Sequence, residues 1–145
     1  MRVEASTDLP IPPERAWAFL TRWEDQVRWM KDADRVDLMT TRLEGVGVRL
    51  AVRTRVFGVP AFTEELEVTA WEPPSRLEIA HRSFLRGRGT WTFEGDATGT
   101  TFTWVEDVSI PVPLLGELAL LVYRPFLRML MRSALRGLRR YVIAS

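Results

Sequence analysis

The sequence has no cysteine and only one histidine, His81, among its 145 residues. Without cysteine there can be no disulfide framework, thiolate zinc site, iron–sulfur cluster or cysteine nucleophile. A single histidine also excludes a metal site that requires two imidazoles, and a Ser-His-Asp arrangement would have to be built on His81. The acidic residues show no EF-hand spacing, so we expect neither a metal nor a cofactor.

Phosphate-binding loops and a large charge imbalance are missing as well. The two Gly-x-Gly stretches, at 45–47 and 87–89, lead into predicted strands rather than helices, and no P-loop lysine follows either of them. The chain carries 20 basic and 19 acidic residues, and this net charge of +1 argues against specific nucleic acid binding. Residues 1–10 hold no apolar signal-peptide core, which together with the lack of cysteine predicts a cytoplasmic protein.

What the sequence does contain is a hydrophobic period that changes along the chain. Residues 2–9 partly alternate and end at a proline, which predicts a first strand. Prolines and an acid at 12–14 suit the first turn of a short helix, and a second short helix is predicted at 23–30. The second helix is predicted to bury Val27, Trp29 and Met30.

The middle of the chain, 35–110, reads as consecutive strands. Apolar residues recur there at every second position and turn residues about every ten positions. Val48, Leu50 and Val52, for example, share one face of their strand, while arginines occupy the other face. Burial on one face only, with short connections, predicts an antiparallel sheet.

A long helix is predicted from Leu114 to Tyr141. Pro125 should kink it, because proline removes one backbone hydrogen bond and clashes with the preceding turn. The apolar first half is too short to span a membrane. The chain is therefore predicted to form a single α+β domain over residues 1–145, large enough to bury about two-thirds of its unfolded surface.

Three stretches carry a family resemblance over essentially the whole chain: Ile11–Trp29, Trp71–Leu77 (WEPPSRL) and the Leu/Arg-rich ending Leu130–Tyr141, supported by the glycines at 45–47. The sequence resembles the START/Bet v 1-like (SRPBCC) superfamily, especially its polyketide cyclase/dehydrase branch. The resemblance implies a helix-grip fold, in which a curved seven-stranded antiparallel sheet wraps around a long C-terminal helix and two short helices follow the first strand. It also implies a cavity that in relatives holds lipids, sterols, polyketides or plant hormones, but it names no chemistry.

Three polar residues lie on strand faces that otherwise read as interior. Glu64 lies between Phe62 and Leu66 on one such face. Glu106 lies between Trp104 and Val108 on a later strand, and His81 follows Ile79 by two residues. An unpaired buried carboxylate is costly, so such groups are normally paired, protonated or solvated in a cavity. Three interpretations remain open: the strands slip phase at a bulge or reach water near their ends, the residues line a pocket, or Glu106 and His81 perform acid/base chemistry.

Aromatic residues are the next candidates, because six tryptophans occur in this small domain. Trp17, Trp23 and Trp71 fit ordinary core packing, whereas Trp91 and Trp104 lie on strands that face the helix and could stack a planar ligand. We predict that the ligand cavity is lined by Val52, Phe62, Glu64, His81, Trp91, Trp104, Glu106, Tyr123, Leu127 and Met131.

Arginines with a spacing of four follow one face of the long helix. Such a ladder is ordinarily the solvated side of an amphipathic helix, with cations favourably placed toward the C-terminus. Leu118, Leu121 and Val122 lie on the same side one or two turns earlier, which instead hints at a membrane-surface contact or a homodimer contact. The ladder consists of Arg124, Arg128, Arg132 and Arg136.

The leading hypothesis from the sequence is binding of a small hydrophobic ligand, aromatic or polycyclic, between the sheet and the long helix. The first alternative is a cofactor-independent polyketide cyclase or dehydratase that uses Glu106 and His81 for proton transfer. The second alternative is a protein that docks a membrane or a partner through its Leu/Arg helix.

Overall fold

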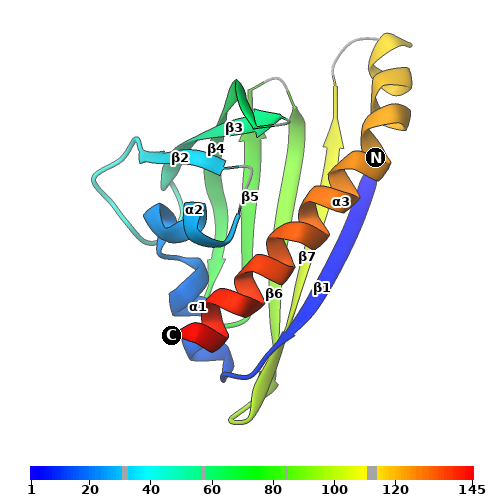
Figure 1. The fold of residues 1–145 in the computed structure, drawn as a ribbon. Helices are drawn as coiled ribbons and strands as arrows, with labels where there is room; N and C mark the ends of the chain where they lie inside the picture. The colour runs from blue at the N-terminus through cyan, green and yellow to red at the C-terminus, as the bar shows by residue number, and fades with distance from the viewer. Residues whose placement is uncertain (31–32, 57, 84, 111–113) are drawn as a thin grey trace.

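The computed structural model describes residues 1–30, 33–56, 58–83, 85–110 and 114–145. Strands are the most abundant secondary structure of the chain, and one long helix follows the last strand (Figure 1). The elements in chain order are β1 (Arg2–Leu9), α1 (Pro13–Leu20), the 3₁₀ turn η1 (Trp23–Asp25), α2 (Gln26–Trp29), β2 (Ala33–Leu38), β3 (Arg49–Val56), β4 (Val59–Glu72), β5 (Arg76–Arg82), β6 (Arg86–Asp96), β7 (Gly99–Ser109) and α3 (Leu115–Ala144).

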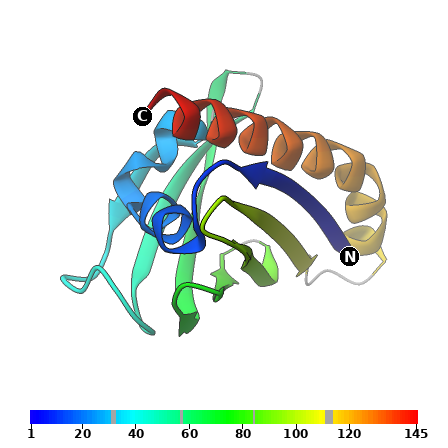
Figure 2. The ribbon, with the colours of Figure 1, turned by 90° about the horizontal axis from the view of Figure 1, so that it is seen from below.

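The seven strands form one antiparallel sheet in the order β1-β7-β6-β5-β4-β3-β2. Consecutive strands from β2 to β7 are neighbours, so the middle of the chain is a meander, and β1 joins it at the far edge beside β7. The sheet is strongly curved, and α3 lies along its concave side next to β1 (Figure 2). The predicted α+β helix-grip fold is confirmed, with the short helices in their expected place after the first strand.

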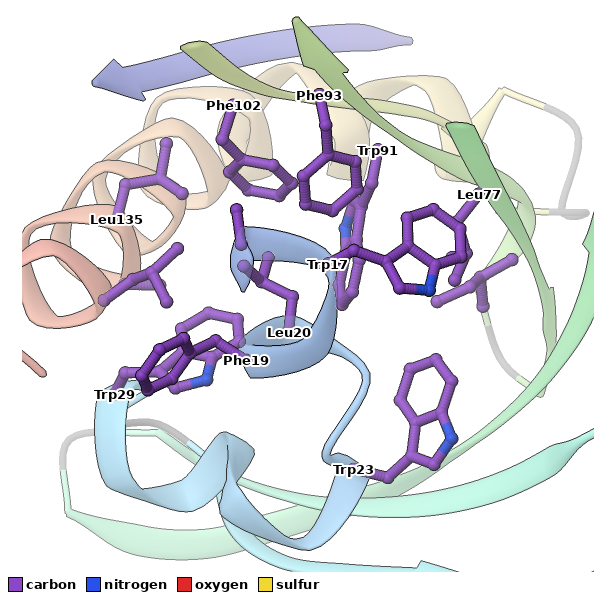
Figure 3. Close-up of a cluster of buried hydrophobic side chains, with 14 of the residues drawn as sticks. Trp17, Phe19, Leu20, Trp23, Trp29, Leu77, Trp91, Phe93, Phe102 and Leu135 are labelled. Atoms are coloured by element: carbon purple, nitrogen blue, oxygen red, sulfur yellow. The ribbon is translucent and has the colours of Figure 1, made fainter. Parts of the chain in front are cut away.

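Aromatic rings gather in the core where α1 and η1 close one end of the curved sheet. Trp17 of α1 packs its ring against Phe93, with the centroids 5.3 Å apart, and Phe93 in turn lies 5.0 Å from Phe102. Figure 3 shows these rings meeting between the helix and the sheet. Trp23 and Trp29 are buried, as predicted, and Trp71 is partly buried and packs against the same core.

The second short helix differs from its prediction. The sequence predicts one helix over 23–30, but the structure has a 3₁₀ turn followed by the four-residue helix α2. A 3₁₀ turn has fewer residues per turn than an α-helix. The residues of α2 that face the core therefore differ from those expected for one continuous α-helix over 23–30. Val27, predicted to be buried, is 37% exposed, and Gln26 is buried in its place at 4%.

Helix α3 matches its predicted extent to within three residues and runs continuously through Pro125, curving along the sheet (Figure 2). Met131, Ala134 and Leu138 face the core, as the apolar stripe predicts. The start of the helix instead exposes large apolar side chains. No helix in the described ranges is long and apolar enough to cross a membrane. The exposed apolar residues are Leu114, Leu115, Leu118, Leu121 and Val122.

Candidate functional site

A cavity of about 120 Å³ lies between the concave face of the sheet and α3. Its wall is mostly apolar, and α2, α3 and every strand except β1 contribute to it. The structure places all ten residues of the predicted lining on this wall, although their roles in binding or catalysis stay predictions. They are Val52, Phe62, Glu64, His81, Trp91, Trp104, Glu106, Tyr123, Leu127 and Met131.

Strand pairing brings the polar residues of the wall together. Val52 on β3 is opposite Glu64 on β4, and Leu66, two residues further along β4, is opposite His81 on β5. These side chains therefore share the concave face at adjacent positions, and no bulge turns them outward. Glu106 reaches the same place from β7.

His81 lies between the two carboxyl groups. Its Nε2 is 2.7 Å from Oε2 of Glu106, and its Nδ1 is 3.4 Å from Oε1 of Glu64. The indole Nε1 of Trp104 donates a hydrogen bond of 2.7 Å to the other oxygen of Glu106. The side chains of His81 and Glu106 are only 10% and 9% exposed, so these interactions are shielded from bulk water.

The surroundings of His81 favour the charged imidazolium. Burial alone would lower the pKa of His81, but the hydrogen bond to Glu106 and the nearby carboxylate of Glu64 outweigh it. Together they raise the pKa of His81 from its usual 6.5 to about 10. At neutral pH the site therefore holds an imidazolium between two carboxyl groups, with one proton on each ring nitrogen.

Two atoms of this cluster are buried without a hydrogen-bond partner: Nδ1 of His81 and Oε1 of Glu64. They face each other across a gap that is too long for a good hydrogen bond. A buried polar group without a partner is costly, so these two atoms are the least satisfied part of the cluster.

Gly89 lines the cavity as well, a role that its Gly-x-Gly stretch did not predict. It pairs with Glu106 across β6 and β7, and a Cβ at this position would lie 2.8 Å from Oε1 of Glu106. The absence of a Cβ at this position leaves room for the Glu106 carboxyl group where it stands. A glycine inside a predicted strand is itself the signal of such a close approach.

The rest of the wall was also not predicted. Gln26 reaches it only because the 3₁₀ turn rotates α2, and no sequence pattern signals that rotation. The others are apolar or small residues that a sequence pattern assigns to the core without separating core from cavity. They are Met30, Ala33, Thr54, Leu66, Ile79, Leu85, Val108, Leu130 and Ala134.

The predicted arginine ladder lies away from the cavity. Arg124, Arg132 and Arg136 are exposed, Arg128 is half-buried, and none of the four lines the wall. Among the described residues, no group of three or more His, Asp or Glu side chains could hold a metal ion. The charged groups that the described cavity wall presents are therefore those of Glu64, His81 and Glu106.

Comparison with known families gives one match. A family model described as "Polyketide cyclase / dehydrase and lipid transport" matches residues 1–142. A search among curated proteins finds no match.

Several solved structures share the fold. A protein from Thermus thermophilus has a TM-score of 0.80 at 23% identity, covering 99% of this chain and 98% of that chain. The Zhui aromatase/cyclase from Streptomyces sp. R1128 has a TM-score of 0.74 at 15% identity, covering 99% and 92%. A START superfamily protein from Mycobacterium smegmatis has a TM-score of 0.72 at 10% identity, covering 99% and 97%. At these identities the likeness establishes the fold.

Proposed function

This chain belongs to the polyketide cyclase/dehydrase and lipid transport family, and from that premise we propose that it binds a small hydrophobic ligand in the cavity between the sheet and α3. The observation that carries the proposal is the cavity itself, a mostly apolar space with a few convergent polar groups at one place on its wall. This combination is typical of small-molecule sites, where apolar surface gives affinity and polar groups fix orientation.

The volume of the cavity favours a ligand with one ring over a fused polycycle. An engineered protein cavity of roughly 150 Å³ binds benzene, and the cavity here has about 120 Å³. Phe62, Trp91, Trp104 and Tyr123 supply aromatic surface on the wall, against which a planar ring can stack.

A thermal-shift and calorimetric screen of single-ring compounds tests ligand binding. Leu127→Trp should fill the cavity and abolish the rise in Tm caused by any compound that binds the parent protein, because Leu127 lines the cavity. Met129→Trp is the matched control, since Met129 lies on the same helix, is exposed and does not line the cavity. Equal binding by both variants, or no binding by the parent protein, would overturn the proposal.

Acid/base catalysis is a second candidate function, favoured by the contact of 2.7 Å between His81 and Glu106. Aldol closure and dehydration of a polyketide-like substrate need a base that removes a C–H proton and an acid that protonates the departing hydroxyl, which leaves as water. The Glu106 carboxylate supplies the base and the His81 imidazolium the acid.

Incubation with a short poly-β-ketone thioester, followed by mass spectrometry, tests this chemistry. Loss of one water per molecule is expected from the parent protein. Glu106→Gln should abolish turnover and leave affinity nearly unchanged, while Glu94→Gln, at an exposed position on β6, should change neither. If Glu106→Gln weakens binding and turnover equally, the residue serves binding only.

The start of α3 supports a third candidate, docking to an anionic lipid surface. Leu118, Leu121 and Val122 are exposed there, and Arg124 and Arg132 follow on exposed positions of the same helix. Apolar side chains that insert among acyl chains, next to cations that contact phosphate, are typical of interfacial helices.

Co-sedimentation with phosphatidylserine and phosphatidylcholine vesicles separates lipid docking from its alternatives. We expect binding to the anionic vesicles only, weaker at high salt, and reduced by the double variant Arg124→Glu/Arg132→Glu. A dimer in sedimentation equilibrium that Leu121→Ser dissociates would assign the same surface to a second copy of the chain instead.

A further inference from the structure

The charged groups of the cavity do not balance. Glu64 and Glu106 supply two carboxyl groups to the described wall, and His81 is the single basic group among them. The arginines of the neighbouring strands cannot correct this excess, because none of them lines the cavity. In a mostly apolar space, an excess of one acidic group favours a ligand that brings a positive charge.

The carboxyl groups of Glu64 and Glu106 differ in the number of hydrogen bonds that they already accept. Glu106 receives hydrogen bonds from both sides, from His81 on one oxygen and from Trp104 on the other, each at 2.7 Å. Glu64 makes only the long contact of 3.4 Å to His81, and its Oε1 is buried without a hydrogen-bond partner. Glu64 is therefore the carboxyl group of the site with capacity to accept a further hydrogen bond.

The aromatic side chains of the wall add to the preference for a cation. Trp91, Trp104 and Phe62 line the same cavity as Glu64. The negative face of an aromatic ring attracts a cation, and this attraction is strongest where water is excluded. An ammonium ligand in this cavity would thus have a carboxylate to bind and aromatic side chains on the same wall.

Resting on the ligand-binding function proposed above, we infer that the natural ligand is a small aromatic or aliphatic amine. Its protonated nitrogen donates a hydrogen bond to the carboxylate of Glu64, whose side chain is 17% exposed and lines the cavity, while its apolar body fills the space between the sheet and α3. The cavity volume limits that body to about one six-membered ring. A neutral hydroxyl also donates to a carboxylate, but it brings no charge. A carboxylate ligand would add a third negative group to the site.

Four ring compounds of nearly equal size form the test: toluene, benzyl alcohol, benzylamine and benzoate. Calorimetry at pH 7, where an alkylamine is protonated, should rank benzylamine first, about tenfold tighter than benzyl alcohol, because a hydrogen bond between two charged groups is stronger than one with a single charge. Benzoate should bind most weakly.

Glu64→Gln is the decisive variant, because it keeps the shape and the acceptor oxygen and removes the charge. The preference for benzylamine over benzyl alcohol should disappear, while the alcohol still binds, and that selectivity ratio is a readout that mere loss of stability does not move. Glu65→Gln is the matched control, since Glu65 is the next residue on β4, pairs with Arg49 and does not line the cavity. It should keep the ratio of the parent protein.

The outcomes separate the two proposals. If none of the four compounds binds the parent protein, the proposed function itself fails. If toluene or benzyl alcohol binds as tightly as benzylamine, the cavity binds ligands but the inference of an amine is wrong. It is wrong as well if Glu64→Gln retains the preference for benzylamine.

Discussion

At the scale of single residues, His81 is the group on which the polar side of the cavity depends. It contacts both carboxyl groups, and they hold its pKa near 10. Because the chain has no other histidine, the imidazole signals in a proton NMR spectrum belong to this residue without assignment.

The raised pKa predicts a specific dependence of stability on pH. Between pH 6.5 and about 10 the folded protein holds a proton on His81 that the unfolded chain has released. The free energy of unfolding should therefore be highest below pH 6.5 and should fall as pH rises toward 10, by at most about 1.4 kcal/mol per pH unit from this group. Urea unfolding at pH 6, 8 and 10 measures the slope.

His81→Asn is the control for this prediction, because its slope over the same pH range should be nearly flat. If that variant does not fold, an NMR titration of the His81 imidazole in the parent protein tests the raised pKa by itself. An imidazole midpoint near 6.5 would contradict the proposed pairing with Glu64 and Glu106.

Gly89 allows a second prediction at this scale. A methyl group in Gly89→Ala would lie within 3 Å of the Glu106 carboxyl group and push it away from His81. The pKa of His81 should then fall from about 10 toward 6.5, which the same NMR titration measures. Thr90→Ala, one residue along β6, should leave the midpoint unchanged, and an unchanged midpoint in Gly89→Ala would mean that the carboxyl group has room to spare.

The sequence could predict which residues face the cavity but not how they pair. Strand alternation is enough to place Glu64, His81 and Glu106 on inward faces. The register between strands decides which carboxyl group binds which ring nitrogen of His81. This register, for example the pairing of Gly89 with Glu106, is set by turns and by packing across the sheet. The hydrogen bond from Trp104 to Glu106 depends on the side-chain rotamers of both residues, which strand alternation does not fix.

At the scale of elements, strands and the long helix were predictable because their hydrophobic periods are long and regular. The short helix α2 was not, because four residues carry too little periodicity to fix a phase. Its position is instead set by contact with α3, where Gly137 lies against the backbone of Trp29.

This contact reverses the usual effect of a glycine in a helix. At an exposed helical position Gly→Ala stabilises by about 1 kcal/mol. A Cβ on residue 137, however, would overlap the backbone carbonyl oxygen of Trp29, which cannot move without shifting α2. We expect Gly137→Ala to lower the free energy of unfolding by about 1–3 kcal/mol in urea titrations.

The control for the helix contact is Arg136→Ala, one residue earlier and exposed, which should change stability by less than about 0.5 kcal/mol. A more stable Gly137→Ala would show that α2 and α3 are less tightly apposed than the structure has them.

At the scale of the whole molecule, one hydrophobic cluster joins both ends of the chain. It includes Val3 and Leu9 of β1, Trp17 of α1, Leu50 of β3 and Leu138 of α3. Because every region contributes to the same core, we propose that residues 1–145 fold as a single cooperative domain.

Cooperativity can be measured by following urea unfolding with tryptophan fluorescence and far-ultraviolet circular dichroism. The two midpoints should coincide, because a domain of this size with one core normally unfolds in one step. An earlier loss of helical signal would mean that α3 detaches before the sheet unfolds, and would contradict a single cooperative unit.

The pairing of β1 with β7 has a consequence for the order of folding. Arg2 is opposite Asp107 and Leu9 is opposite Thr100, so in the described sheet the strand that is synthesised first, β1, pairs with the strand that is synthesised last, β7. At about 5–20 residues per second, roughly ten seconds pass before that partner is made. During this time β1 is an unpaired strand with one apolar face, and the local hairpins β3–β4 to β6–β7 can form without it. Closure of the sheet by β1 is therefore expected to be the late, slow step of folding, and the step at which chaperones have most to protect.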